Sequence, residues 1–284
     1  MPIVPAPCAS KSRTIKTGTS RKSGSSPLSP RARAWVGPWL WLFGVGLSTG
    51  PALGAQSGLA YLGEELSALQ ADPFANPGLL WVDRGEALWH QVPALGGKAC
   101  ASCHGPAETL APLVPTLPRW NGSRGGLENL EGLIRQCQTD RQGVAPAPYE
   151  SEALLALTAR LSFAAQGRPL SGQVTPKAAE ALARGEAFFY QRRGQLELSC
   201  ADCHERYAGA RLRGDRVSEG MINGFPIYRL TWQTLGSRHR MFRWCNEAVR
   251  AEPFAYGAEP YLELELYLRQ RGAGLPVETP AVRR

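Results

Sequence analysis

The chain has 284 residues, enough for one large or two small domains, and its apolar fraction of 43% is typical of a protein with a packed core. The formal net charge of +8 is unevenly placed, because residues 1–55 hold seven basic residues and no acidic one. The rest of the chain is therefore close to neutral, which argues against a nucleic-acid-binding protein.

The N-terminus has the pattern of an export signal. A basic, Ser-, Pro- and Gly-rich segment precedes a 13-residue apolar run, Trp35–Leu47, and small residues then lead to a cleavage site after Ala55. The apolar run is shorter than the ~20 residues that cross a bilayer. We therefore predict an export signal peptide at 1–55, a periplasmic location and no membrane span in the mature form. An uncleaved anchor is the alternative.

The cysteines constrain the function of the mature chain. An exported protein meets an oxidising compartment, where thiols tend to pair. One of the seven cysteines leaves with the signal peptide, and six remain to be explained. The full set is Cys8, Cys100, Cys103, Cys137, Cys200, Cys203 and Cys245.

Two copies of one pattern follow the signal. The phrase Arg84–Ala87 (RGEA) recurs as Arg184–Ala187, and the motif CASCH at 100–104 recurs as CADCH at 200–204. Each phrase lies the same distance before its motif. A repeat of this size indicates two similarly folded domains rather than a solenoid.

Each copy is expected to begin and end with a helix. The opening helices are predicted near 82–92 and 178–193, the second with Thr175 as N-cap before Pro176. The closing helices are LLALTARLSF and YLELELYLRQ, whose leucines recur at helical spacing.

Connecting segments are read from composition. The closing helices belong to the aligned segments Tyr149–Gly167 and Tyr256–Gly274. The segment Gln166–Thr175 is the natural linker between the copies, and strand signals are sparse apart from a short run at Ile227–Leu230.

C-x-x-C-H is the attachment sequence for c-type haem. Two thiols at this spacing bind the two vinyl groups of one porphyrin, and the adjacent histidine becomes the proximal iron ligand. Two copies behind an export signal favour two covalently bound haem c groups over the alternatives, which are disulfides or zinc sites. The predicted attachment cysteines are Cys100, Cys103, Cys200 and Cys203, and the axial histidines are His104 and His204.

The fold class follows from the repeat and the motifs together. We predict a mostly α protein with two cytochrome-c-like haem domains in tandem, related by internal duplication. The first domain is expected at 56–170 and the second, carrying the active site, at 171–284.

The repeat also selects the sixth iron ligands. The first copy contains no methionine, and only Cys137 lies where a distal ligand is expected, ahead of the last helix. Cys245 is its counterpart in the second copy. A disulfide between these two cysteines, and Met221 as the second distal ligand, are the alternatives. Because thiolate ligation lowers the potential of haem iron, Cys245 suits a site where the sulfur itself reacts.

The segment Phe225–Leu268, and above all the run around Cys245 and Arg250–Pro253, resembles the SoxA family of periplasmic sulfur-oxidation cytochromes. The resemblance covers about 80–284. Because the motifs of both copies are present, the chain is similar to the dihaem members of the family.

The resemblance implies an L-cysteine S-thiosulfotransferase, in which thiosulfate is oxidatively coupled to a cysteine of the carrier protein SoxYZ. It implies a monohaem partner, SoxX, that accepts electrons, and it places the catalytic sulfur, carried as a persulfide, at Cys245. The alternatives are a thiosulfate dehydrogenase that forms tetrathionate and a dihaem electron-transfer cytochrome without catalysis.

Arginines close to Cys245 are the expected substrate ligands, because guanidinium groups match the sulfonate oxygens of thiosulfate. The candidates are Arg240, Arg243 and Arg250. The resemblance implies an arginine four residues before the cysteine, where this chain has Met241. Arg240 and Arg243 flank that position and are the expected replacements. The alternatives for each arginine are pairing with a haem propionate and a solvated surface charge.

Overall fold

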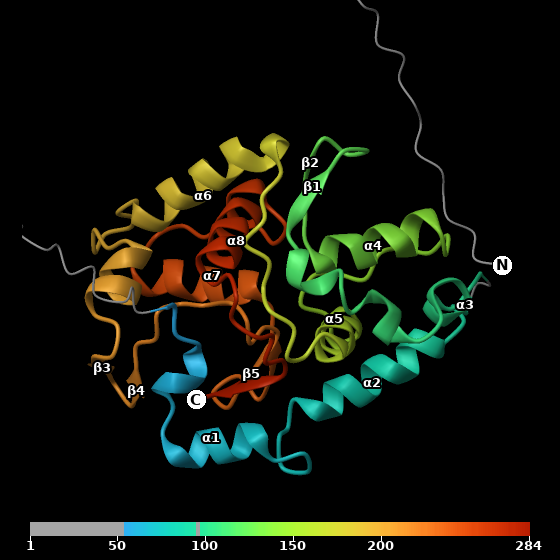
Figure 1. Cartoon of the computed structure of the whole chain (residues 1–284), viewed down its shortest axis with the longest axis horizontal. Coiled ribbons are helices and arrows are strands. Elements are labelled where there is room, and N and C mark those ends of the chain that lie inside the picture. Colours follow the sequence, from blue (N-terminus) through green and yellow to red (C-terminus); the bar gives the residue numbers. More distant parts are fainter. Residues whose placement is uncertain (1–53, 95–96) are drawn as a thin grey trace, which may run out of the picture. The chain divides into compact units, whose positions relative to one another are not determined.

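The computed structural model describes residues 54–94 and 97–284, which are coloured in Figure 1. The predicted export signal lies outside the described residues except for its last two positions, and so does Cys8. None of the helices in the described residues is long and apolar enough to cross a membrane.

Helices dominate the structure, and most of them occur as pairs of equal length. After α1 (Glu64–Ala71), the chain forms α2, α3, α4 and α5, and then α6, α7 and α8. The bounds are α2 Leu79–His90, α3 Cys100–His104, α4 Leu130–Asp140, α5 Glu152–Ala164, α6 Ala179–Tyr190, α7 Arg238–Ala248 and α8 Glu259–Arg271. α2 and α6 have 12 residues each, α4 and α7 have 11, and α5 and α8 have 13.

The strands of the described residues are short and form three small sheets. The antiparallel pairs are β1–β2 and β3–β4, and the third sheet has the order β6–β5–β7 with β5 and β7 parallel. The bounds are β1 Arg119–Asn121, β2 Gly126–Glu128, β3 Arg211–Leu212, β4 Asp215–Arg216, β5 Ile227–Arg229, β6 Thr234–Gly236 and β7 Ala281–Arg283. β5 confirms the predicted strand, whereas the other strands, at two or three residues, are too short for a sequence pattern.

Local sequence accounts for the helix starts. The side chains of Asn129, Ser151 and Ser237 accept hydrogen bonds from backbone N–H groups in the first turns of α4, α5 and α7. The predicted N-cap Thr175 precedes a short 3-10 helix, Pro176–Ala178, and its side chain makes no cap hydrogen bond. The predicted opening helices (α2 and α6) and closing helices (α5 and α8) are confirmed, with shifted bounds.

The glycine of each RGEA segment lies where one helix contacts another. α2 packs on α5 at the buried Gly85, and α6 packs on α8 at the buried Gly185. A β-carbon on Gly85 would lie 2.7 Å from Arg160 Cβ, and one on Gly185 would lie 2.5 Å from the carbonyl carbon of Glu263. Glycine therefore lets each opening helix rest directly on its closing helix.

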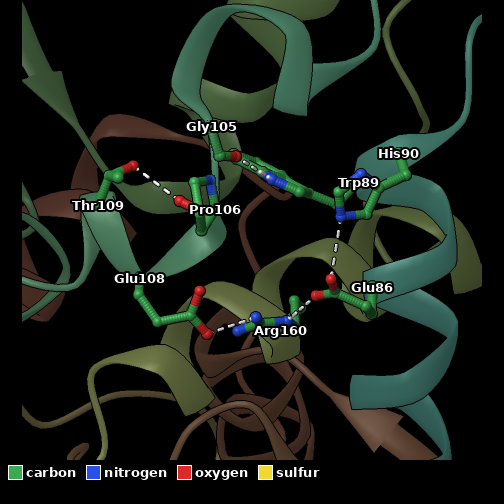
Figure 2. A network of polar contacts seen from close by, with 8 residues as sticks. All are labelled: Glu86, Trp89, His90, Gly105, Pro106, Glu108, Thr109 and Arg160. Atoms are coloured by element: carbon green, nitrogen blue, oxygen red, sulfur yellow. Dashed lines mark hydrogen bonds and ion pairs between the residues drawn. The ribbon is translucent and has the colours of Figure 1, made fainter.

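Charged residues of the same phrase hold these helix pairs together. Arg184 forms an ion pair with Glu263 of α8, with Nε and Oε1 2.6 Å apart. In the other pair, Arg160 of α5 pairs with Glu86 of α2 and with Glu108, in the short 3-10 helix Ala107–Leu110 after the first CxxCH motif. Figure 2 shows Arg160 between these two carboxylates.

Each hairpin packs against the helix pair of the other copy. Tyr228 and Leu235 of the β5–β6 hairpin lie in one apolar cluster with Val82 and Leu155 from α2 and α5. Reciprocally, Leu127 of β2 packs with residues of α6 and α8, and Figure 1 shows the β1–β2 hairpin beside α8. The predicted linker is also fixed, because Leu170 exchanges backbone hydrogen bonds with the segment after α8.

A buried polar cluster connects α4, α7 and α8. Glu265 is 0% exposed and accepts hydrogen bonds from Arg238 (2.8 Å) and Asn129 (3.0 Å), while His239 Nε2 lies 3.3 Å from its second oxygen. Burial would raise the pKa of Glu265, but Arg238, His239 and Asn129 outweigh it and lower that pKa. Burial and the charge of Glu265 raise the pKa of the adjacent Glu131, which therefore holds its proton more tightly.

Candidate functional site

The first CxxCH motif forms α3 and is held by the end of α2. The indole N–H of Trp89 donates to the carbonyl oxygen of Gly105 (2.9 Å), and the Trp89 ring lies 5.8 Å from that of His104. Figure 2 shows the Trp89–Gly105 contact, with Thr109 closing the turn that follows. His90 faces Glu86 at 3.0 Å on the exposed side of α2, so it is not part of this site.

The second motif orients its histidine through the backbone. His204 Nδ1 lies 2.7 Å from the carbonyl oxygen of Ser218, so this nitrogen carries the proton and Nε2 is left free as a ligand. Burial lowers the pKa of His204, which favours the neutral imidazole that iron binding requires. Gly220 has a φ of +74°, and a β-carbon there would lie 2.9 Å from His204 Cγ. The residues around His204 therefore fit a proximal haem ligand.

Cys137 and Cys245 occupy matching places beside different CxxCH motifs. Cys137 lies near the end of α4 and close to Cys100. Burial raises the pKa of the Cys100 thiol, and the charge of Cys137 raises it further. Cys245 lies on α7, and burial, followed by the charges of Cys200 and Cys203, raises the pKa of its thiol to about 12. A thiolate at Cys245 therefore fits the presence of a bound cation such as haem iron.

The structure gives no support to the alternative ligand assignments. All six cysteines from Cys100 to Cys245 are unpaired in the described residues, and Cys137 is close to Cys100 whereas Cys245 is close to Cys200 and Cys203. Met221 follows Gly220 at the back of the His204 ring, and its sulfur lies beside Gly272 at the end of α8. These contacts place the Met221 sulfur beside the end of α8.

The three predicted substrate arginines lie in different surroundings. Arg240 stacks on Trp232 (4.4 Å) and faces Glu150 at 3.9 Å. Arg243 donates to the carbonyl oxygen of Phe254 and stacks on Tyr256. α4 has an arginine, Arg135, with the same pair of contacts, to the carbonyl oxygen of Ala147 and the ring of Tyr149. Arg135 in the first copy and Arg243 in the second thus each hold the loop that follows their own helix.

Arg250 lies in a more open place. It has a φ of +58° and is exposed. Together with Arg193 it lines an open pocket of about 560 Å³ between the loop after α6 and the loop after α7. Its guanidinium is 3.5 Å from the amide oxygen of Gln195, so this arginine is available to an anion.

Sequence reasoning missed a fourth arginine. Arg229 ends β5, and its Nη1 lies 3.8 Å from the sulfur of Met241, one helical turn before Cys245. Its charge lowers the pKa of Cys245, against the larger effect of burial. The sequence offered little indication of this arginine, because Arg229 is sixteen residues before Cys245 and only the fold of the β5–β6 hairpin brings it close to α7.

Comparison with known proteins identifies the family. The SoxA/TsdA cytochrome c domain model matches residues 84–170. The L-cysteine S-thiosulfotransferase subunit SoxA of Rhodovulum sulfidophilum is 37% identical over 229 residues, and that of Pseudaminobacter salicylatoxidans is 38% identical over 230 residues, each covering 80% of both chains. The crystal structure of SoxXA from P. pantotrophus matches with a TM-score of 0.78 and 35% identity, covering 81% of this chain and 87% of that chain. The chain therefore belongs to the SoxA family of L-cysteine S-thiosulfotransferase subunits.

Proposed function

We propose that this chain is the catalytic c-type cytochrome subunit of a sulfur-oxidising complex, which couples thiosulfate to a cysteine of a SoxYZ-like carrier protein. The observation that carries the proposal is the position of Cys245, an unpaired thiol beside the second CxxCH motif in a SoxA-family chain. Such a thiol in an exported protein calls for a chemical role.

Two covalently bound haem c groups are part of the proposal. Cys100 and Cys103 would attach the first, with His104 and Cys137 as axial ligands. Cys200 and Cys203 would attach the second, with His204 and Cys245 as axial ligands. The free Nε2 of His204 and the unpaired state of all six thiols support this assignment. When bound, haem supplies a one-electron acceptor next to the reacting sulfur.

A tandem duplication explains the paired architecture. Helix pairs of equal length, the reciprocal packing of the hairpins and the matching contacts of Arg135 and Arg243 support two related domains. We place them at 56–170 and 171–284. The signal peptide at 1–55 and a periplasmic location complete this part of the proposal.

In the proposed reaction, Cys245 is a sulfur relay. The thiolate of Cys245 and the terminal sulfur of thiosulfate form an S–S bond, and this oxidation releases two electrons. The carrier thiolate then attacks the adduct, takes over the thiosulfonate group and returns the Cys245 thiolate. In total, thiosulfate and one carrier thiol give the conjugate, one proton and two electrons. A SoxX-like monohaem cytochrome, as in the SoxXA complex, is the proposed electron-accepting partner.

Arginines supply the positive charge that a dianionic substrate needs. Arg250 lines an open pocket with Arg193 and is the most accessible of the three proposed substrate ligands. Arg240 and Arg243 would first have to release their contacts with Glu150 and Phe254.

Two replacements of Cys245 test the proposal. Cys245→Ala removes both the iron ligand and the thiol, whereas Cys245→Met keeps a sulfur ligand for the iron but cannot exchange thiols. Both variants should retain attached haem, measured by intact mass, and both should fail to conjugate thiosulfate to the carrier. Conjugation by Cys245→Met at the wild-type rate would contradict the relay, and tetrathionate formed without carrier would favour the dehydrogenase alternative.

A further inference from the structure

Arg229 forms no direct ion pair with an Asp or Glu side chain in the described residues, although it is half-buried close to Cys245. No Asp or Glu oxygen of the described residues lies within 4.0 Å of its guanidinium. Its Nε donates to a backbone oxygen of Arg284, the last residue of the sequence (2.8 Å), which leaves the outer nitrogens directed elsewhere. The charge of Asp215 raises the pKa of Arg229, but burial has the larger effect and lowers that pKa. A partly buried guanidinium without a direct side-chain partner is stabilised when an anion joins it.

Aromatic side chains fix the direction of this guanidinium. Its central carbon lies 5.2 Å from the ring centre of Trp232 and 4.9 Å from that of Trp244, the residue before Cys245. Met241 touches its Nη1 at 3.8 Å, one turn before Cys245 on the same face of α7. Trp244 is 40% exposed, so this edge of the site is open to solvent.

The sheet places a second arginine on the strand next to Arg229. Arg229 of β5 is the register partner of Arg283 of β7, and like charges opposite one another in a sheet are unfavourable. Burial lowers the pKa of Arg283 to about 10; the charge of Glu278 opposes this, and the charge of Arg229 makes a smaller contribution in the same direction as burial. An anion bound to Arg229 would offset this small repulsion.

The matching position of the first hairpin carries no charge. The residue that matches Arg229, at the third position of the first hairpin strand, is Asn121. Its amide faces Gln136, the residue before Cys137, as Arg229 faces the residue before Cys245. The positive charge is thus specific to the half that carries the proposed relay sulfur.

We infer that Arg229 recognises the sulfonate end of thiosulfate and so holds the soft terminal sulfur toward Cys245. This inference rests on the proposed function of Cys245. Arg229 is a specificity residue, because it selects a substrate with a charged sulfonate over a neutral sulfur compound of similar size. Met241 has no charge and cannot bind the sulfonate, so this role falls to Arg229, which contacts the Met241 sulfur.

Charge-selective labelling of the holoprotein tests the inference without the carrier. The probes are sodium (2-sulfonatoethyl) methanethiosulfonate, which is anionic, and methyl methanethiosulfonate, which is neutral. Both transfer an alkylthio group to a thiolate and release methanesulfinate, and peptide mass locates the label at Cys245. In wild type the anionic probe should react preferentially. In Arg229→Gln this preference should fall about tenfold, because a charge-assisted hydrogen bond is lost.

Matched variants separate charge from structure. Arg229→Lys should restore part of the preference, and Arg211→Gln, an exposed arginine on β3, should leave it unchanged. In the conjugation assay, Arg229→Gln should raise the KM for thiosulfate about tenfold with little change in kcat.

Two results would overturn the inference. One is an unchanged probe preference and KM in Arg229→Gln. The other is a shifted haem midpoint potential with unchanged preference, which would assign Arg229 to a haem carboxylate instead. Failure of the proposed function is distinguishable, because it would show as conjugation by Cys245→Met whatever the probes report.

Discussion

Replacing Gly185 by alanine tests the close contact between α6 and α8 on which the second half of the structure depends. A β-carbon at this position would lie 2.5 Å from the Glu263 carbonyl carbon, whereas ordinary contacts begin at 3.4 Å. The opposing atoms are backbone, so no side chain can turn away. The two helices would have to separate by roughly 1 Å, which opens the packing along α6 and strains the Arg184–Glu263 ion pair.

The expected magnitude comes from two opposing effects. Alanine in place of a helical glycine gains about 1 kcal/mol in helix propensity. Overpacking against a rigid neighbour typically costs about 1–3 kcal/mol, and contact with backbone puts this site at the upper end. We therefore expect a net loss of about 1–2 kcal/mol in the free energy of unfolding, or a Tm lower by roughly 2–8 °C for a chain of this size.

Thermal unfolding followed by far-UV circular dichroism measures this loss. Gly85→Ala should behave alike, because its β-carbon would meet Ala156 and Arg160 of α5 in the same way. Gly63→Ala is the control, since it has a φ of −73° and nothing lies within 4 Å of its β-carbon. A Gly185→Ala variant as stable as wild type would refute the proposed basis of the repeated phrase.

Two further predictions concern the buried polar cluster, and two concern the sulfur site. Glu131 has a raised pKa, so the folded chain binds this proton more tightly than the unfolded chain, and stability falls as pH rises above the ordinary carboxyl range. Glu131→Gln should thus gain in Tm over wild type progressively between about pH 5 and 8; a constant difference would contradict the assignment. Glu265→Gln leaves Arg238 buried without its charge partner and should cost about 3 kcal/mol or more by denaturant unfolding, unlike the exposed Glu64→Gln. Cys245→Met should lose conjugation while keeping its haem, and Arg229→Gln should raise the KM for thiosulfate about tenfold.

Much of the fold could be predicted because the repeat presents the sequence pattern of each main helix twice. The phrase at Arg84–Ala87 and Arg184–Ala187 located the opening helices, and leucine spacing located α5 and α8. The motifs themselves predicted a cytochrome c protein, which the family match confirms. Local sequence was sufficient here because helix periodicity and the CxxCH spacing are both short-range signals.

Contacts between residues that are far apart in the sequence could not be predicted from it. Glu131 and Glu265 lie far apart in sequence, and nothing in either segment predicts that they share one buried cluster. Apart from β5, which was predicted, the strands of the interlocked hairpins have three residues and are too short for a periodic signal. Both features depend on how the two halves pack, which the sequence of one chain does not reveal.

The site was predicted in part for the same reason. Repeat logic paired Cys137 with Cys245, and each lies beside its own motif. Proximity in sequence favoured Arg240 and Arg243, but their guanidinium groups contact Glu150 and Phe254. Arg229 instead reaches α7 from a neighbouring strand, so spacing along the chain could not identify it.

Mass analysis of Cys245 during the reaction tests the central claim most directly. The holoprotein, an electron-accepting cytochrome and thiosulfate labelled in its terminal sulfur would be mixed without carrier, and the Cys245 peptide isolated. The proposed relay predicts that this peptide gains the labelled thiosulfate group and loses it to the carrier when carrier is added. A carrier that becomes labelled while the Cys245 peptide never carries label would contradict the account.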